Sequence, residues 1–510
     1  SPQTLKEFKV LDLIHGYRTR GHLFTLTNPV RTRRSYSPDL SLENYGLNNS
    51  DLDIVFQAGN EIGLGPISLK EIISHLEETY CNSISTEYMY IREPNRVQWI
   101  RKNIELDKRK KFDATERLQI LKKISQATLF EEFLQKKYIG QKRFSLEGGE
   151  SLIPALDSLI EQGAKNGVKE VVIGMAHRGR LSTLAHILGK SYRDIFSEFQ
   201  GKDFEGDDNL EGDVKYHLGH SFTRKTDSDK EVSITLAPNP SHLESVDPVV
   251  LGISRARIDE RGGDENAVLP ILVHGDAAIA GQGVVYEVVQ MAGLEGYKTG
   301  GTIHIVVNNQ IGFTTNYLDA RTSTYCTDIG KVTQSLIFHV NADYPEAVVQ
   351  VMRIALKYRQ TFHRDVFVDL LGYRKYGHNE GDEPKFTQPK LYKAIASHSS
   401  PYEIYLAQLI SDGNLTKEEG ATLRKAQIDL MEDGLSIAKQ KDTNSVENFL
   451  SDIWKDYRTA THEELTTSPD TKYPDKKIRE IGVSISTLPK GKMFFRKSAK
   501  LLKDRRKMLE

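Results

Sequence analysis

Two apolar runs separated by a helix-length segment restrict the fold of this chain more than any other feature. The first run, Val268–His274, leads into Gly275-Asp276. The second run, Thr302–Val307, leads into Asn308-Asn309, and the segment Gly281–Gly293 lies between the two. Nearly continuous apolar runs are typical of strands that are covered on both faces. The pattern predicts a strand–helix–strand unit of an open α/β sheet, in which ligands collect at the carboxyl ends of the strands.

The same alternation of strands and helices extends from about residue 112 to residue 400. Three further runs have the character of buried strands: Glu170–Met175, Ser233–Ala237 and Val366–Leu371. Residues 1 to about 110 instead show apolar side chains at helical spacing. After residue 400 the pattern is helical again, and Thr416 and Glu419 are spaced as a capping box.

We therefore expect an α/β fold with three parts. A helical domain at 1–110 precedes an α/β domain with a mostly parallel sheet at 111–400, and a helical segment with a basic linker follows at 401–510. The stretch from Lys472 onward holds thirteen Lys and Arg residues against four Asp and Glu residues. Such a run favours a solvated surface over an arm that docks on an acidic partner.

Composition narrows the class of protein. Lys and Arg number 69 and Asp and Glu number 70, so no strongly basic surface points to nucleic acid. The two cysteines, Cys81 and Cys326, are too few for a disulfide framework and fit a reducing compartment. No apolar run approaches the length needed to span a membrane. We expect a protein of the bacterial cytoplasm or of the mitochondrial matrix, with neither nucleic acid nor membrane as its partner.

Oxygen-bearing residues at the two central strand ends form a candidate metal site. Asp276 offers a charged oxygen and Asn309 an amide oxygen, and the carbonyl of Ile311 could supply a third ligand. Mg²⁺ prefers such oxygen ligands and often bridges a carboxylate to a phosphate. Small residues beside Asp276, among them Gly275, would let backbone amides approach a diphosphate. An ordinary aspartate at a strand end remains the alternative for this short motif.

Polar loops follow other expected strands and supply histidines. His177 and Arg178 follow the first strand, and such a pair can hold a carboxylate or a phosphate. His217 and His378 lie in two further loops, and Ser241 is expected to cap a helix. Each residue alone also fits a structural role, but four such loops in one domain point to a shared site.

Taken together, these strings resemble the first, decarboxylating component of the thiamine-diphosphate-dependent 2-oxoglutarate dehydrogenase complex. The resemblance runs from IHGYRTRGH at residues 14–22 to the end of the chain. It is carried by SLEGGE, GMAHRGR, DVKYHLG, NPSHLE, GDAAIAGQG, NNQIGFTT, YCTDIGK and GHNEGDEP.

The resemblance implies a role for each residue of the candidate site. Magnesium ligands would be Asp276, Asn309 and the carbonyl of Ile311. Contacts to thiamine diphosphate would come from Arg178, Ser241, Leu243, Gly275, Asp276, Ala277, Asn309, Ile311 and His378. The substrate would meet His177, Arg178, His217 and Ser241, with His177 and His217 as the catalytic pair.

The same resemblance implies an activity and partners. The activity would be oxidative decarboxylation of 2-oxoglutarate in the tricarboxylic acid cycle, with transfer of the succinyl group to a lipoyl group on the second component. The full-length enzymes would be homodimers. They carry a further C-terminal half with a pyrimidine-binding domain, so we expect this chain alone to be inactive. Alternatives are a 2-oxoadipate-specific paralogue and a non-catalytic short form that binds cofactor or partners.

Overall fold

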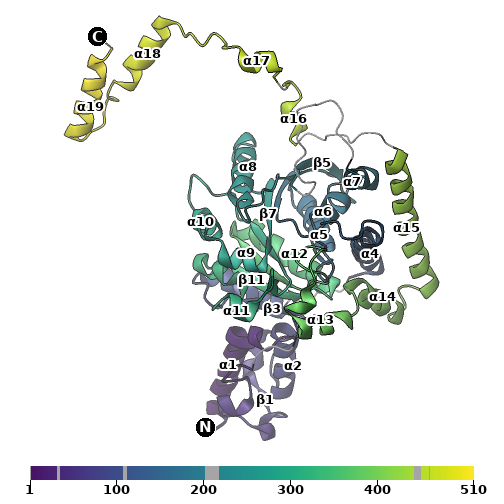
Figure 1. Cartoon of the computed structure of the whole chain (residues 1–510). Coiled ribbons are helices and arrows are strands. Elements are labelled where there is room, and N and C mark those ends of the chain that lie inside the picture. Colours follow the sequence, from purple (N-terminus) through teal and green to yellow (C-terminus); the bar gives the residue numbers. More distant parts are fainter. Residues whose placement is uncertain are drawn as a thin grey trace. The chain divides into compact units, whose positions relative to one another are not determined.

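The computed structural model describes residues 2–31, 35–106, 112–201, 217–440, 449–458 and 460–509, and it divides into two compact units, 1–451 and 452–510 (Figure 1). Lys215 and Tyr216 of the second histidine string lie outside the described residues, as do residues 107–111. Within the described residues, no helix is long and apolar enough to cross a membrane.

An eight-stranded sheet in the order β3-β11-β12-β8-β7-β4-β6-β5 forms the centre of the first unit. The strands from β11 to β6 are parallel, and the edge strands β3 and β5 run antiparallel to their neighbours. The bounds are β3 (Ile84–Glu87), β4 (Glu170–Met175), β5 (His220–Lys225), β6 (Glu231–Leu236), β7 (Val268–Gly275), β8 (Ile303–Asn308), β11 (Leu336–Asn341) and β12 (Val366–Leu371). This arrangement confirms the expected α/β class with a mostly parallel sheet.

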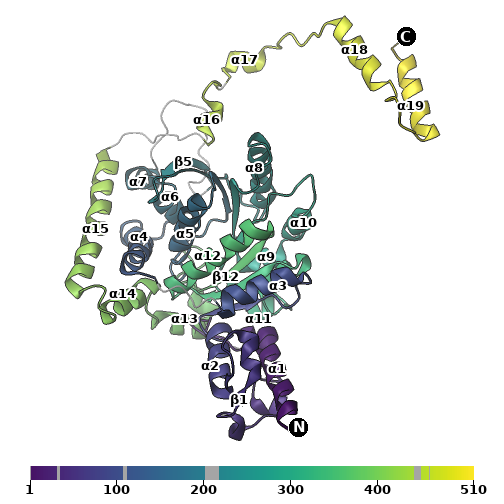
Figure 2. The same cartoon turned by 180° about the vertical axis from the view of Figure 1, so that it is seen from behind.

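Helices cover both faces of this sheet, which explains the unbroken apolar runs (Figure 2). On β4, Val171 and Ile173 join the core beneath α5 (Leu152–Lys165) and α12 (Pro345–Phe362). The intervening Val172 belongs to a second core with Val246 and Val250 of α8 (Val246–Glu260). Successive strand residues point to opposite faces, so a strand that is covered on both faces is apolar at most of its positions.

The expected helical character of the first hundred residues holds for α1 (Pro2–Arg20), α2 (Leu69–Tyr80) and α3 (Pro94–Arg101). Within it, β3 departs from that expectation by pairing with β11. The short β1 (Val55–Phe56) and β2 (Ile67–Ser68) pair with each other. The strand β3 reads Ile-Ser-Thr-Glu, which is too short and polar to give a strand signal in the sequence.

The helical segment after residue 400 is present as expected. It contains α14 (Pro401–Ser411) and α15 (Lys417–Gln440). The capping box is confirmed, because the Glu419 amide donates to Thr416 Oγ1 at 3.1 Å and the Thr416 amide donates to Glu419 Oε2 at 2.8 Å. The second unit contains α16 (Ser451–Trp454), α17 (His462–Thr466), α18 (Asp475–Ile485) and α19 (Arg496–Lys507).

The remaining elements surround the sheet. They are α4 (Ala114–Lys137), α6 (Arg180–His186), α7 (Tyr192–Phe199), α9 (Asp276–Gly281), α10 (Gly283–Met291), β9 (Ile311–Gly312), β10 (Thr315–Asn316), α11 (Tyr317–Ala320) and α13 (Pro389–Ala396).

Candidate functional site

The strand order brings the predicted residues to one edge of the sheet. Moving along the order β12-β8-β7-β4-β6, the loops at the carboxyl ends carry His378, Asn309, Asp276, His177 and Ser241 in turn. The carboxyl ends of parallel strands share an edge, so loops distant in sequence become neighbours. His217 joins them because the antiparallel strand β5 begins where β6 ends.

Asp276 and the Asn309 turn are in direct contact. Asp276 opens α9 and is 2% exposed, and burial raises the pKa of its carboxyl to about 6. Arg321, whose Nη1 lies 3.7 Å from Asp276 Oδ2, and the backbone N–H of Asn309 both act to lower that pKa. A Cβ added at Gly312 would lie 2.6 Å from the Cβ of Ala277, so α9 and β9 approach closely.

The contact residues fit a small cation that carries a diphosphate. Asp276 and Asn309 supply buried oxygen donors, and Ile311 at 4% exposure follows within the same turn. The positions where Cβ atoms would be added to Gly275, Gly281 and Gly283 face open space, and Ala277 is exposed. A hard cation with bound phosphate needs oxygen ligands from the protein and, beside them, open space that small residues leave for the phosphate.

Two of the predicted histidines meet directly. The Nε2 atoms of His177 and His217 lie 2.8 Å apart, so one proton can be shared between them. Burial lowers the pKa of His177 to about 4, and the neighbouring His217 acts in the same direction. The His177 imidazole is therefore neutral at physiological pH and can either donate or accept a proton.

His378 approaches this pair through an aromatic contact. The ring of Phe144 has its centroid 5.1 Å from that of His177 and 5.6 Å from that of His378. The ring centroids of Phe313 and His378 lie 4.1 Å apart. Burial lowers the pKa of His378 to about 4. Neither phenylalanine was predicted, because only the folded loops bring these rings against the histidines.

Arg178 ties two loops of the edge together. Its Nη1 donates to the Ser145 carbonyl at 2.7 Å and its Nη2 donates to the His378 carbonyl at 2.9 Å. Burial lowers the pKa of its guanidinium to about 10, so Arg178 stays positively charged at neutral pH. The side chain thus both pins the loops and contributes a positive charge to the edge.

The turn after β6 differs from expectation. Ser241 is exposed and Leu243 is partly buried, and α8 begins only at Val246. The predicted helix cap at Ser241 is therefore wrong. Glu244 has a φ of +67°, a left-handed conformation that interrupts the chain before the helix starts.

Arg180 is a buried support of the histidine pair that sequence reasoning missed. Its guanidinium donates to three backbone carbonyls, those of Met175 at 3.1 Å, Leu218 at 2.8 Å and Ala237 at 2.6 Å. These carbonyls belong to the segments that carry His177 and His217 and to the end of β6. The residue lies within the GMAHRGR string, but its partners are remote in sequence and leave no local signal.

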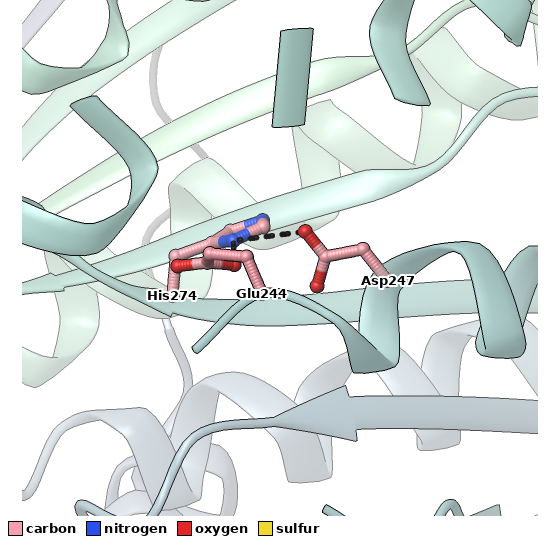
Figure 3. A group of neighbouring side chains, drawn as sticks. All are labelled: Glu244, Asp247 and His274. Carbon is pink, nitrogen blue, oxygen red and sulfur yellow. Dashed lines mark hydrogen bonds and ion pairs between the residues drawn. The ribbon is translucent and has the colours of Figure 1, made fainter. Parts of the chain in front are cut away.

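A second cluster that was not predicted consists of Glu244, Asp247 and His274 (Figure 3). His274 Nδ1 is 2.6 Å from Glu244 Oε2 and 3.8 Å from Asp247 Oδ2, and the ligand atoms of the three residues lie within 4.8 Å of one another. Such a group could hold a metal ion. In the structure, the Glu244 carboxylate faces a protonated His274, and Asp247 keeps its proton at neutral pH. Burial opposes the charged form of His274, but Glu244 raises its pKa to about 9, and burial raises the pKa of Asp247 to about 8.

The contacts within this cluster also hold the turn after β6 in place. The Glu244–His274 pair joins that turn to the end of β7, and His274 Nε2 lies 3.0 Å from His304 Nδ1 on β8. The turn after β6, the end of β7 and the start of β8 are connected in this way.

Comparison with known proteins agrees with this arrangement. Residues 122–447 match the family model described as the dehydrogenase E1 component. The chain is 41% identical over 516 aligned residues to the proteins named 2-oxoglutarate dehydrogenase E1 component of Brucella ovis, Brucella anthropi and Brucella canis. Each alignment covers 98% of this chain and 51% of the relative, so the chain spans about half the length of these relatives.

The matched region includes the loops at the carboxyl ends of the parallel strands, from the His177 loop after β4 to the His378 loop after β12. It continues through α15. The family model covers more than half of the chain, and the fold has the parallel sheet on which these strand-end loops converge. The chain belongs to the dehydrogenase E1 component family.

Proposed function

We propose that this chain is the diphosphate-binding part of a 2-oxoglutarate dehydrogenase E1 component. The observation that carries the proposal is the 41% identity to such components along 98% of the chain. The convergence of Asp276, Asn309 and the histidine pair on one edge of the sheet supports it. The names of these relatives favour 2-oxoglutarate over 2-oxoadipate as the substrate.

In this proposal, Asp276, Asn309 and the carbonyl of Ile311 hold Mg²⁺. The diphosphate lies against Gly275 and Ala277, where the chain leaves open space. Further cofactor contacts come from Arg178, Ser241, Leu243 and His378. Bound thiamine diphosphate supplies the electron sink that decarboxylation of a 2-oxo acid requires.

The remaining side chains bind and orient the substrate. Arg178 offers a cation to a carboxylate, because its guanidinium remains charged in its buried setting. His177 and His217 hold one shared proton between their Nε2 atoms and can pass it to or from the reacting oxygen. Phe144 and Phe313 both pack against His378 and orient its ring.

The proposal extends to the partners of the whole enzyme. The succinyl group passes to the lipoyl group of the succinyltransferase component of the complex. The active enzyme is a homodimer. Both statements rest on the relatives' membership of the complex and on the family resemblance.

Calorimetric titration of thiamine diphosphate with Mg²⁺ into this chain tests the proposal. We expect binding by the wild-type chain and by Asp12→Ala, a control that removes an exposed carboxylate from α1. We expect Asp276→Ala to lose binding, because the cation loses its only charged ligand in the proposed set. Equal binding by Asp276→Ala would contradict the metal assignment. No binding by any of the three proteins would contradict a complete diphosphate site in this chain.

A further inference from the structure

The turn that carries the proposed metal ligands is backbone-strained at its centre. Gln310, between Asn309 and Ile311, has a φ of +68° and is 2% exposed. A residue other than glycine persists in this region only where its surroundings hold it. The contacts of the Gln310 side chain are therefore among those that hold the turn with its two flanking ligands.

The side chain of Gln310 is held by a residue from the beginning of the chain. Asn28 Nδ2 donates to Gln310 Oε1 at 2.8 Å, and Gln310 Nε2 donates back to Asn28 Oδ1 at 3.1 Å. Gln310 Nε2 also donates to the Gly372 carbonyl at 2.8 Å. Two amides paired in both directions fix each other's orientation, because rotating either group would oppose donor to donor and acceptor to acceptor.

Asn28 is itself firmly placed. Its Oδ1 accepts hydrogen bonds from the amides of Val30 at 3.1 Å and Arg31 at 3.0 Å, which close a tight turn. Arg31 Nη1 donates to Asn316 Oδ1 at 3.1 Å, on the strand that pairs with β9. The segment at 28–31 thus contacts both sides of the metal-ligand turn.

Support from the sheet reaches the same turn at a different point. The backbone N–H of Gln310 donates to Asn308 Oδ1 at 3.0 Å. Asn308 Nδ2 in turn donates to Asp369 Oδ1 on β12 at 2.8 Å. These bonds fix the backbone as it leaves β8. They leave the side-chain amide of Gln310 to be oriented by Asn28 and the Gly372 carbonyl.

We propose that Asn28 is a positioning residue for the metal site, acting through Gln310 on Asn309 and the carbonyl of Ile311. The proposal rests on the proposed function for the identity of the cation. It gives the N-terminal helical region a part in the site that lies 282 residues away along the chain. Partners that orient metal ligands typically alter metal affinity by about 10–100-fold when removed.

The first test is hydrogen exchange in the whole chain without ligand. We expect Asn28→Ala to raise amide exchange in residues 309–316 by about tenfold, since a strained turn loses one of its supports. Asn28→Asp keeps the acceptor for Gln310 Nε2 and for the two backbone amides but loses the donor to Gln310 Oε1, so its exchange should lie between the wild-type rate and that of Asn28→Ala. Asn44→Ala is the matched control, because the exposed Asn44 side chain bonds to its sequence neighbours Asp39 and Ser41.

The second test measures Mg²⁺ binding in the presence of thiamine diphosphate by calorimetry. We expect Asn28→Ala to weaken Mg²⁺ binding by about tenfold and Asn28→Asp, which keeps only the acceptor half of the pair, to weaken it less. Unchanged exchange in a folded Asn28→Ala variant would overturn the proposal. Raised exchange with unchanged Mg²⁺ affinity would also overturn it, while leaving the proposed function intact. A wild-type chain that binds no Mg²⁺ with the cofactor would overturn the proposed function, and this inference with it.

Discussion

At the scale of single residues, burial controls the charges near the candidate site. Glu150 is 1% exposed, and its carboxylate accepts a hydrogen bond from the Gly148 amide at 2.8 Å. Burial raises the pKa of Glu150 to about 8, and the nearby Glu147 acts in the same direction. A carboxyl in this setting keeps its proton at neutral pH in the folded protein.

This shift predicts how stability depends on pH. An unfolded glutamate loses its proton near pH 4.3, whereas folded Glu150 holds it to about pH 8. The contribution of Glu150 to stability is therefore fully present below about pH 4.3 and falls as the pH rises toward 8, by at most about 1.4 kcal/mol per pH unit. Glu150→Gln should remove this decline.

Urea unfolding at pH 5 and pH 8 measures the effect. The loss of unfolding free energy between the two values should be smaller in Glu150→Gln than in the wild type. Glu43→Gln, which changes an exposed side chain, is the control and should behave like the wild type. A Glu150→Gln variant with the full wild-type decline would show that Glu150 is ionised in the folded protein at pH 5.

At the scale of elements, the N-terminal cap of α15 should contribute measurably to the free energy of unfolding. The helix buries Met431 and Leu435 against the core and starts at the Thr416–Glu419 capping box. Thr416→Ala removes the acceptor for the Glu419 amide and should lower the free energy of unfolding by about 1 kcal/mol. Thermal unfolding followed by circular dichroism tests this.

Thr422→Ala in the same helix is the matched control for this prediction. Thr422 is exposed within the helix, where its hydroxyl donates to the Glu418 carbonyl at 2.8 Å. Alanine is the better helix former at such a position, so the control should be neutral or slightly stabilising. If both variants lose equal stability, the cap is not the cause.

The elements also show what a sequence can reveal. β4 and β12 were predicted with the bounds they have in the structure, because a strand covered on both faces is mostly apolar. β11 was missed although it is fully buried and, like β12, carries a single charged or titratable residue, His339. That histidine is satisfied by Asp369 at 2.8 Å and Glu87 at 2.9 Å, partners on two other strands.

The residues of the candidate site could be predicted from the sequence in part. Asp276, Asn309 and His177 could be selected because each follows a recognisable strand. The residues that support them could not be selected. Arg180 bonds to three separate segments, and Asn28 bonds to Gln310, which lies 282 residues later in the chain. Such contacts depend on the strand order, which no local pattern encodes.

At the scale of the whole molecule, the division at residue 451 predicts a preferred site of proteolysis. Lys455, Arg458 and Lys472 are exposed and lie on or beside the short helices of the second unit. Limited trypsin digestion should cut at these residues before it cuts within the sheet domain, because proteases need exposed backbone that can enter their active site. Mass spectrometry of the early fragments identifies the order of cleavage.

Heat-denatured protein serves as the reference for that digestion. It should be cut at lysines and arginines along the whole chain at similar rates. Early fragments of the native protein that end between residues 170 and 371 would contradict the prediction, because these bounds enclose the central strands from β4 to β12.

The edges of the main sheet have a consequence for how the molecule behaves in crowded solution. An exposed edge strand offers free backbone groups to strands of other molecules and can start aggregation. Here β3 is buried along its length, and β5 ends in Arg224 and Lys225. Charged side chains on an edge strand disfavour pairing with a second sheet. Encounters between copies of this chain should therefore proceed through side-chain surfaces, without the backbone pairing that leads to fibres.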